Sequence, residues 1–361
     1  MDFNLTEDRR MLSNTLGRYL DDQYGLEHRN SIAYEAPYYD NAKWQELAEL
    51  GILAALAKEE AGGFGGAGGD IAVVFEAIGK ALVCEPILPV LMASRLLFAA
   101  GKDQSGLLDG SIKYGVALSE PDAPYDISDI TTSANESHKV TGRKSAVYGA
   151  HVADRILVAA RKDRQLNLYE VTSKNAEVIS YGMIDGGGAG EVLLDNSSAE
   201  LILENAGAAV QDAMNASVVA LCSEAVGAME IAYEMTVDYL KQRKQFGRTI
   251  GSFQALQHRA VDMLTEIEQA RSITIKAAAE LGGPEASRFA AMAKNMIGRA
   301  GRQIAEEAIQ MHGGIAMTWE YGLSHYAKRI IMIDHQMGDT DYHLARIMSD
   351  LNATQIGLGS V

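Results

Sequence analysis

Cysteine is nearly absent from this sequence, which limits the ways in which the fold can be held together. The 361 residues include two cysteines, Cys84 and Cys222, which lie far apart among apolar neighbours. Isolated cysteines in apolar surroundings favour buried free thiols over a disulfide, as in a reducing cytosol. We therefore expect a cytoplasmic protein with free thiols, and we expect no metal site.

Basic charge is also scarce. The chain carries 32 Lys and Arg against 48 Asp and Glu, a net charge of −16 at pH 7, which argues against nucleic acid as a partner. An anionic ligand would need a local basic patch in this acidic chain. No stretch is long and apolar enough to predict a membrane span, and the opening Met1-Asp2-Phe3-Asn4 lacks the basic start of a secretory signal. We expect no membrane association.

The hydrophobic pattern divides the chain into three parts. Residues 1–112 have apolar positions at helical spacing, starting with a helix that Thr6 is placed to cap. Residues 113–205 contain short strand-like runs between polar and glycine turns. Residues 206–361 return to long helical patterns, sufficient for a four-helix bundle. The predicted fold is α+β but mostly α, with a small antiparallel β-barrel or sandwich in the middle.

Two small-residue runs have structural interpretations. The glycine-rich run 62–69 does not follow a predicted strand with phosphate-binding spacing, so it predicts a flexible turn. The alanine- and glycine-rich run 290–308 predicts close helix packing.

The middle part contains five predicted strands, at residues 116–118, 138–140, 155–159, 166–171 and 191–194.

The most informative stretch is 239–263, where two helical patterns meet at a glycine-containing break. Basic side chains gather beside this break, at Lys241, Arg243, Lys244 and Arg248. Guanidinium groups near a turn between helices form a suitable binding site for a polyanion. The alternative is a helical hairpin with a solvated basic turn, because charge runs usually mark a solvated surface.

This stretch resembles the signature of the acyl-CoA dehydrogenase family. The matching residues are Tyr239, Arg243, Phe246, Gly247, Ile250, Phe253 and Gln254. A second family block matches Gln310-Met311-His312-Gly313-Gly314, followed by Glu320-Tyr321 and Arg329. The order and separation of the two blocks also fit the family, and the resemblance spans nearly the whole chain. It implies the acyl-CoA dehydrogenase fold, with an N-terminal helical domain, a middle β domain and a C-terminal bundle.

The resemblance implies FAD as the cofactor, extended between two subunits. In the family, residues matching Arg243 and Phe246 hold the pyrophosphate and adenosine region, and residues matching Gln310 and Gly314 assist them. Arginine supplies a fork of donors to a pyrophosphate, and glycine lets the backbone approach it. For Gly314 and its neighbour Gly313, a helix C-cap is the structural alternative.

The segments that contact the flavin ring depart from the family pattern. Ser119 can still donate a hydrogen bond to the flavin, but Asp122, Pro124 and Tyr125 replace residues of the family's glycine-rich segment. The family's later W-x-T or W-x-S motif is missing its tryptophan, and Tyr148 takes the place of the small hydroxyl. The flavin pocket is therefore expected to be altered or filled.

The usual catalytic base is also missing. The family's reaction is α,β-dehydrogenation of an acyl-CoA thioester, in which a carboxylate removes the α-proton. The two places where relatives carry this glutamate correspond to Met337 and Ser217, and neither side chain can serve as the base unaided. Glu224 lies on the helix face of Ser217 among apolar neighbours, which makes it a candidate base. The alternative is a buried structural glutamate paired with a basic group.

Three functions follow from this mixture of intact and missing residues. In the first, the chain is one subunit of a heteromeric acyl-CoA dehydrogenase, similar to the short subunits of α2β2 bacterial enzymes that act on steroid side-chain CoA esters. A second subunit then supplies flavin contacts and base, and electron-transferring flavoprotein is the expected acceptor. In the second, a homotetramer uses Glu224 or another displaced carboxylate. In the third, the chain is a non-catalytic scaffold or binding protein without flavin.

Overall fold

The computed structural model describes residues 5–358, with side chains described as far as residue 351. Contacts group the chain into two compact units, neither of which is continuous in sequence. The first unit contains the segment ending at Leu26, Ile71–Val83 and the chain from Val218 onward; the second contains Glu27–Asp70 and Cys84–Ser217. The division into domains 1–112, 113–205 and 206–361 remains a prediction about the order of element types.

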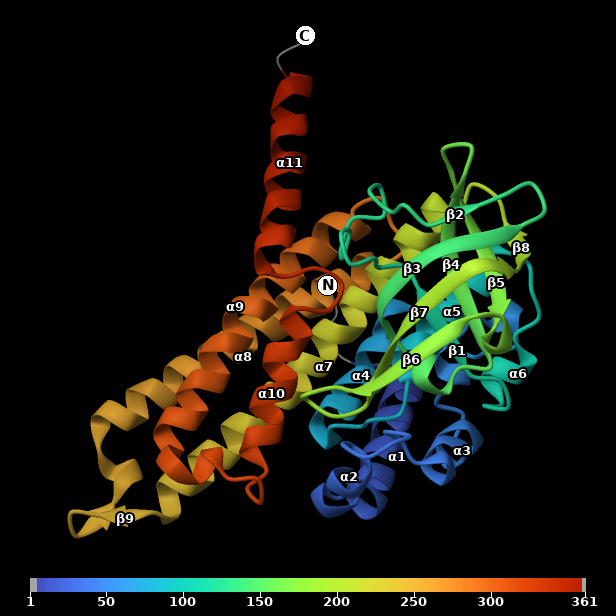
Figure 1. The fold of residues 1–361 in the computed structure, drawn as a ribbon. Coiled ribbons are helices and arrows are strands. Elements are labelled where there is room, and N and C mark those ends of the chain that lie inside the picture. The colour runs from blue at the N-terminus through green and yellow to red at the C-terminus, as the bar shows by residue number, and fades with distance from the viewer. Residues whose placement is uncertain (1–4, 359–361) are drawn as a thin grey trace. The chain divides into compact units, whose positions relative to one another are not determined.

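Helices and 3-10 turns fill the N-terminal third, as predicted. They are α1 (Glu7–Gln23), α2 (Leu26–Ile32), α3 (Asn41–Glu49), η1 (Ala54–Leu56), η2 (Glu59–Ala61), α4 (Gly68–Ala81), α5 (Ile87–Ala99) and α6 (Ser105–Leu108) (Figure 1). The Thr6 hydroxyl accepts a hydrogen bond from Arg9 N at 3.4 Å, so the predicted cap is confirmed. Pro89 lies in the first turn of α5, where its missing N–H has no intrahelical partner to lose.

The glycine-rich run 62–69 is a packed loop that leads into the first residues of α4, and not a flexible connector. A Cβ placed on Gly63 would lie 2.3 Å from Ala57 O, and one on Gly65 would lie 2.3 Å from Ala55 O. Glycine is required here because the loop folds directly against the backbone that precedes it. The prediction of a turn is correct, but the prediction of flexibility missed this close packing.

The second unit contains an eight-stranded sheet, drawn in green in Figure 1. Its strands are β1 (Tyr114–Ala117), β2 (Ser133–Ala134), β3 (Lys139–Tyr148), β4 (Arg155–Lys162), β5 (Gln165–Thr172), β6 (Glu177–Gly182), β7 (Gly188–Ser198) and β8 (Glu200–Leu203). Seven of them follow the order β6-β7-β3-β2-β4-β5-β8, and β1 pairs with β4. The pairing is mainly antiparallel, with β1 and β2 running parallel to β4.

The core of this sheet is built from alternating apolar residues, as the strand patterns predicted. Val140, Val147, Ile156, Val158 and Val192 are among the buried residues that form it. All five predicted strands exist, whereas β2, β6 and β8 were missed. Strand β6 is exposed along most of its length, so the hydrophobic alternation that would reveal it is weak.

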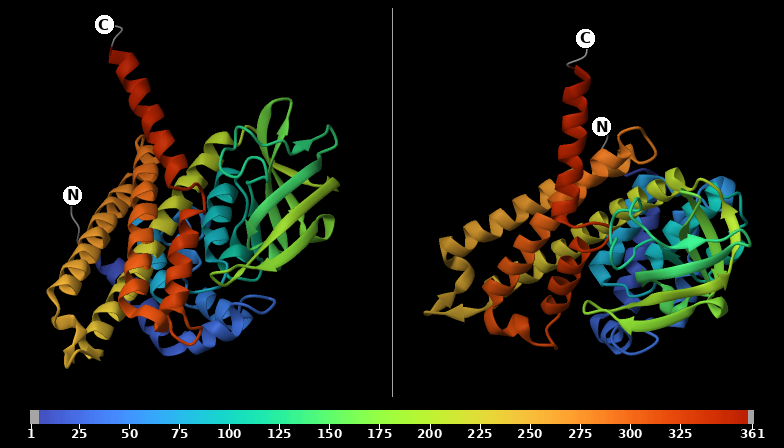
Figure 2. Two further views of the ribbon diagram at one scale, coloured as in Figure 1. Left: turned by 60° about the vertical axis from the view of Figure 1, so that its left-hand side comes forward. Right: turned by 45° about the horizontal axis from the view of Figure 1, so that its top comes forward.

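Long helices make up the C-terminal part. They are α7 (Gly207–Gln242), α8 (Gln254–Glu280), α9 (Ala286–His312), α10 (Leu323–Asp334) and α11 (Thr340–Leu358). The hairpin of β9 (Lys244–Gln245) and β10 (Arg248–Thr249) and the turn η5 (Ile250–Ser252) connect α7 to α8, and η6 (Gly313–Met317) follows α9. Figure 2 shows α8 and α9 running side by side. The predicted fold class is confirmed.

Small residues set the helix spacing in the first unit. A Cβ on Gly79 of α4 would lie 2.0 Å from Glu224 O, and one on Gly227 of α7 would lie 2.1 Å from Glu76 O. On α9, a Cβ on Gly298 would lie 2.1 Å from Asp334 Oδ1. The run 290–308 therefore does permit close packing, as predicted.

Helix α7 corrects the expectation that no stretch of the sequence is long and apolar enough to span a membrane. An 18-residue window within Gly207–Gln242 has a mean hydropathy of 1.3, so the helix is long and apolar enough to cross a membrane by length and composition. However, 83% of that window is buried in the structure, as in the core helix of a soluble protein. The sequence interpretation overlooked the stretch because its apolar residues are mostly alanine and valine rather than a continuous run of large side chains.

The two cysteines are free thiols, as predicted. Cys222 is fully buried, and burial raises the pKa of its thiol to about 12. Cys84 is half-buried, so complete burial was correctly predicted for Cys222 alone.

Candidate active site

The two sequence blocks meet at a stacked ring pair. Tyr239 of α7 stacks on His312 of α9, with ring centroids 4.5 Å apart and planes inclined by 26°. His312 Nδ1 lies 2.8 Å from Ala308 O, and its Nε2 lies 3.1 Å from the Tyr321 hydroxyl. Burial lowers the pKa of His312, which favours the neutral ring in this stack. The stack therefore fixes the end of α7 beside the end of α9.

The predicted nucleotide-binding residues are exposed on the first unit. Arg243, Phe246, Gln310 and Gly314 all lie at the surface, and Phe246 is 90% exposed. Phe246 and Gly247 form the turn of the β9–β10 hairpin with φ of +54° and +78°. Two positive φ values in a two-residue turn are typical of type I′. The Phe246 ring lies edge-on to the Phe253 ring, with centroids 6.2 Å apart, and most of its surface stays exposed.

The surroundings of these residues fit an adenosine diphosphate group. The side chains of Arg243 and Gln310 make no hydrogen bond or ion pair within residues 5–351, so their donors are available. A Cβ on Gly314 would meet nothing within 4 Å, so the backbone there faces open space. Arg248 lies over the Phe253 ring at 4.0 Å and supports the base of the hairpin. The roles of Arg243, Phe246, Gln310 and Gly314 as FAD ligands remain predictions that this geometry suits.

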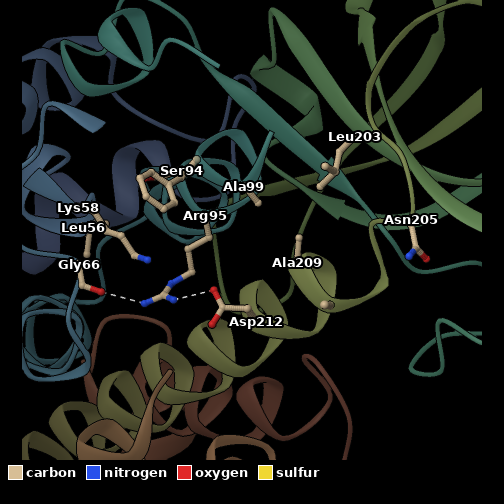
Figure 3. Close-up of a pocket in the computed structure, with 12 residues that line it drawn as sticks. Leu56, Lys58, Gly66, Ser94, Arg95, Ala99, Leu203, Asn205, Ala209 and Asp212 are labelled. Carbon is tan, nitrogen blue, oxygen red and sulfur yellow. Dashed lines mark hydrogen bonds and ion pairs between the residues drawn. The ribbon is translucent and has the colours of Figure 1, made fainter. Parts of the chain in front are cut away.

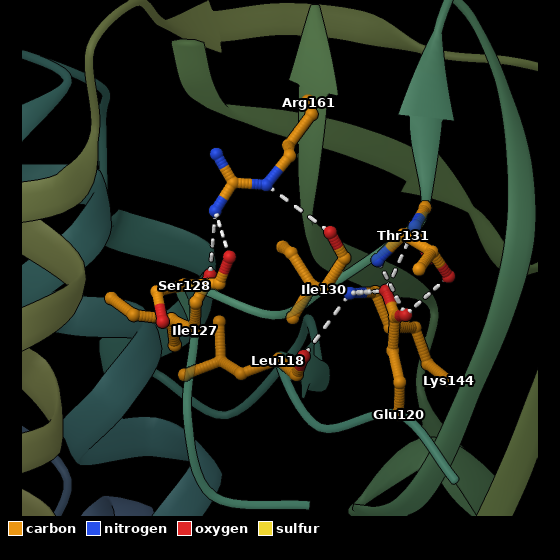
Figure 4. Close-up of polar contacts among 9 residues, drawn as sticks. Leu118, Glu120, Ile127, Ser128, Ile130, Thr131, Lys144 and Arg161 are labelled. Atoms are coloured by element: carbon orange, nitrogen blue, oxygen red, sulfur yellow. Dashed lines mark hydrogen bonds and ion pairs between the residues drawn. The ribbon is translucent and has the colours of Figure 1, made fainter. Parts of the chain in front are cut away.

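In the second unit, the two predicted flavin segments are joined by a buried ion pair (Figure 4). Glu120 follows Ser119, and its Oε1 accepts a hydrogen bond from Lys144 Nζ at 2.8 Å. Lys144 also donates to Leu118 O at 3.1 Å, and Glu120 Oε2 accepts from the backbone and hydroxyl of Thr131. Ser119 itself is half-buried, and its hydroxyl has no partner among the described residues.

Electrostatics in this pair favour the charged forms at neutral pH. Burial alone would raise the pKa of Glu120, but hydrogen bonds from Lys144, Thr131 and Thr132 lower it to about 2. Burial lowers the pKa of Lys144 to about 8, and Glu120 opposes that shift. Both pKa values are lowered, which favours the charged form of Glu120 but opposes that of the more deeply buried Lys144. The 2.8 Å contact and the donors around Glu120 support an ionised pair.

Two residues that the sequence did not single out shape the same region. Arg161 donates to the carbonyls of Ile127, Ser128 and Ile130, which closes the loop after Glu120 (Figure 4). Glu191 accepts hydrogen bonds from Arg143 Nε at 2.9 Å and from Ala146 N at 3.2 Å. Glu191 lies in the predicted strand 191–194, and Arg161 lies two residues beyond the predicted strand 155–159. A charged residue in or beside a strand does not distinguish a partner from a solvated side chain.

The residue that replaces the family tryptophan lies at an irregularity of β3. Ala146 has φ of +49°, and the register of β3 against β7 shifts between Lys144 and Val147. The contact from Ala146 N to Glu191 stabilises this bulge. Tyr148 follows it at the end of β3 and is half-buried. This chain therefore presents a phenol where the family motif has a small hydroxyl.

Neither family position for the base carries a carboxylate. Met337 lies in the turn between α10 and α11 with φ of +55°, and its carbonyl accepts a hydrogen bond from His343 Nε2 at 2.9 Å. Buried Lys294 holds the same turn by donating to Asp334 O at 2.8 Å and Gly338 O at 2.6 Å. Ser217 is fully buried and donates to Ala213 O of its own helix at 2.8 Å.

The candidate base Glu224 is engaged by an arginine. It is 3% exposed, and its two oxygens accept hydrogen bonds from Arg329 Nε at 2.5 Å and Nη2 at 2.8 Å. Arg329 also donates to Gln336 at 3.0 Å. A bidentate guanidinium stabilises the carboxylate and occupies both oxygens, so this geometry favours the structural alternative for Glu224 over proton transfer.

Comparisons with known proteins agree with the two sequence blocks. Residues 6–104 match the family model described as acyl-CoA dehydrogenase, N-terminal domain, and residues 205–360 match acyl-CoA dehydrogenase, C-terminal domain. Acyl-CoA dehydrogenase IpdE2 of Mycobacterium tuberculosis is 30% identical over 330 residues, which cover 90% of this chain and 91% of that protein.

Solved structures give the same result for the fold. A variant of the Tcur3481–Tcur3483 steroid ACAD superimposes with a TM-score of 0.89 at 26% identity, covering 97% of this chain and 99% of the other. The ChsE4–ChsE5 complex from Mycobacterium tuberculosis contains a chain with a TM-score of 0.90 at 23% identity, covering 98% and 99%. At that identity the second match bears on the fold alone. The chain belongs to the acyl-CoA dehydrogenase family, whose members are FAD-dependent oxidoreductases that act on CH–CH bonds.

Proposed function

We propose that this chain is one subunit of a heteromeric acyl-CoA dehydrogenase. In this assembly it supplies the adenosine diphosphate part of the FAD site, and a second subunit supplies the catalytic carboxylate and the main flavin contacts. One observation carries the proposal: the residues at the predicted nucleotide-binding positions are exposed, and Arg243 and Gln310 have no side-chain partner within residues 5–351, in a chain whose two base positions are Met337 and Ser217. A chain that had lost FAD altogether would have no reason to keep Arg243, Phe246 and Gln310 together.

Each residue has a role that follows from its chemistry. Arg243 presents a planar fork of N–H donors to a pyrophosphate, and Gln310 adds an amide that both donates and accepts. Phe246 offers an exposed ring face against which an adenosine can pack. The chemistry that FAD supplies in this family is the acceptance of a hydride from the β-carbon of the acyl thioester. The thioether of Met337 cannot accept the α-proton, so that step falls to the partner subunit.

An apolar groove on the first unit supports the need for a partner. It has a volume of about 950 Å³ and is lined by residues of α8 and α9, together with Ile347 of α11. Val261, Leu264 and Met296 are among the residues that line it. Exposed Leu344, Met348 and Leu351 extend the apolar surface along α11. Exposed apolar area of this extent is typical of a surface that another subunit covers.

The names of the relatives suggest the substrate class. Tcur3481–Tcur3483 is described as a steroid ACAD, and the ChsE4–ChsE5 structure is described as a complex of two proteins. By analogy we propose a steroid-derived acyl-CoA thioester as the substrate and electron-transferring flavoprotein as the electron acceptor. We propose the cytoplasm as the site of action.

The deciding experiment is co-expression with the acyl-CoA dehydrogenase subunit encoded beside this chain, followed by measurement of mass and flavin content. We expect a complex with fewer flavins than chains, and we expect the chain alone to be colourless or poorly soluble. Full flavin and turnover in the chain alone would overturn the proposal in favour of a self-sufficient homotetramer. A complex that recovers neither flavin nor activity would favour the scaffold function.

A further inference from the structure

A second cleft lies within the second unit and is lined by none of the predicted FAD residues. Its volume is about 430 Å³, and its walls come from the end of α5, the first turns of α7 and the loops near Leu56 and Leu203 (Figure 3). Pockets for small ligands in proteins begin at roughly 300 Å³, so the cleft has room for a small organic molecule.

Two cations and one carboxylate surround the cleft. Arg95 donates from Nη1 to Asp212 Oδ2 and from Nη2 to Gly66 O, both at 2.8 Å. The Arg95 side chain is 9% exposed, and its Nε–H has no acceptor among the described residues. Lys58 is exposed and has no carboxylate partner among those residues, and its Nζ lies 4.4 Å from the centre of the Phe98 ring. Figure 3 shows the Lys58 and Arg95 head groups directed into the same part of the cleft.

The start of α7 adds further positive potential. Ala208 and Ala209 line the cleft, and their backbone N–H groups have no acceptor among the described residues. The first turn of a long helix carries a partial positive charge, and its free N–H groups are donors for an anion. This feature adds to the two side-chain cations, which face the cleft independently of it.

The remaining walls are apolar. Leu56, Phe98, Ala99 and Leu203 face the cleft, and Phe98 is partly exposed there. A ligand that suits the cleft therefore has an anionic group at one end and a compact apolar body at the other. Lys58 and Arg95 contribute two positive charges and Asp212 one negative charge, so the local surplus matches a monoanion better than a doubly charged phosphate.

We propose that this cleft is a binding site for a small monocarboxylate with an apolar body. The carboxylate lies between Lys58, the Arg95 guanidinium and the first turn of α7, and the apolar body lies against Phe98 and Leu56. None of the residues that line the cleft is among the predicted FAD residues, and the proposal does not require the heteromeric assembly.

Calorimetric titration of the full-length protein with 4-phenylbutyrate tests the site directly, with 4-phenylbutanamide as the uncharged control of the same shape. We expect saturable binding of the acid and much weaker binding of the amide. Lys58→Gln should weaken binding of the acid about five-fold, as for loss of one partly exposed charge contact. Lys139→Gln, a matched change at another exposed lysine, should have no effect.

A third variant should change the affinity for the acid in the opposite direction. Asp212→Asn removes the competing carboxylate, so the acid should bind more tightly than to the wild-type protein, a result that general damage to the fold would not produce. Equal binding of acid and amide, wild-type affinity in Lys58→Gln, or no tightening in Asp212→Asn would each overturn the proposal. Competition between 4-phenylbutyrate and an acyl-CoA would also overturn it, because the probe would then occupy the substrate site.

Discussion

At the scale of single residues, the buried pair of Glu120 and Lys144 makes acid stability testable. Glu120 has a pKa of about 2 in the folded protein, below the ordinary value of 4.5. Its contribution to the free energy of unfolding is therefore present above pH 4.5 and is lost as the pH falls toward 2. Glu120→Gln leaves Lys144 buried without its partner and should cost about 3–5 kcal/mol in free energy of unfolding near pH 6. Urea unfolding at pH 6 and pH 3 should show this difference shrinking at the lower pH.

The control for that measurement is Glu136→Gln. Glu136 pairs with Lys162 at 2.9 Å on the surface, so its replacement should change stability far less than the buried substitution does. A gap between wild type and Glu120→Gln that stayed constant from pH 6 to pH 3 would contradict an ionised Glu120 held by its hydrogen-bond donors.

Glu224 offers a second test at the residue scale. Because Arg329 occupies both of its oxygens, Glu224→Gln should leave turnover of the assembled enzyme close to wild type while lowering its stability by about 3–5 kcal/mol. Steady-state kinetics and chemical unfolding on the same preparation separate the two effects. Glu234→Gln, an exposed change on the same helix, should alter neither.

A fall in turnover of about 10²–10⁴-fold in a folded Glu224→Gln enzyme, the range expected for loss of a general base, would instead make Glu224 catalytic.

At the scale of elements, the β9–β10 hairpin is the part that the proposed function ties most directly to cofactor binding. Phe246 is 90% exposed, so Phe246→Ala removes no core packing, and alanine meets the same positive φ. The substitution should therefore lower FAD occupancy of the assembled complex without changing the unfolding free energy of the flavin-free protein. Absorbance of bound flavin per chain measures the first effect, and urea unfolding measures the second.

Gln245→Ala on the adjoining strand is the matched control, because Gln245 is also exposed and lies one residue before the turn. Equal flavin occupancy in Phe246→Ala, Gln245→Ala and wild type would remove the proposed role of the aromatic ring.

Elements with strong periodicity and specific motifs could be predicted, and long-range polar partners could not. The Thr6 cap, the five core strands and the break at Gly247 follow from local spacing alone. The contact between Glu120 and Lys144 joins residues that are 24 positions apart, and the one between Glu224 and Arg329 spans 105 positions. Nothing local in the chain distinguishes such partners from solvated charges. The same limit explains why Arg161 and Glu191 were missed.

At the scale of the whole molecule, the features form a consistent pattern. The predicted nucleotide-binding residues are exposed, the two family base positions carry no carboxylate, and the α8–α9 groove and α11 expose apolar side chains. A self-contained enzyme would need a base, whereas a chain that works within a larger assembly needs an outward-facing site and a surface to bury. Each feature alone has a structural explanation; their combination favours a site completed by a second subunit.

This pattern leads to a prediction about the flavin content of the complex when a residue of this chain is replaced. In the proposed assembly the partner supplies the main flavin contacts and the base, yet Arg243→Ala in this chain should empty the FAD site, because the pyrophosphate loses its bidentate donor. Lys241→Ala removes a neighbouring positive charge that is paired with Asp238 at 3.7 Å, so it should leave occupancy unchanged. The measurement is flavin per complex, with the mass of the complex checked for both variants.

An intact Arg243→Ala assembly with normal flavin content would mean that the adenosine diphosphate group is held elsewhere. Loss of flavin in both variants would mean that the general positive charge of this turn, and not the geometry of Arg243, governs binding.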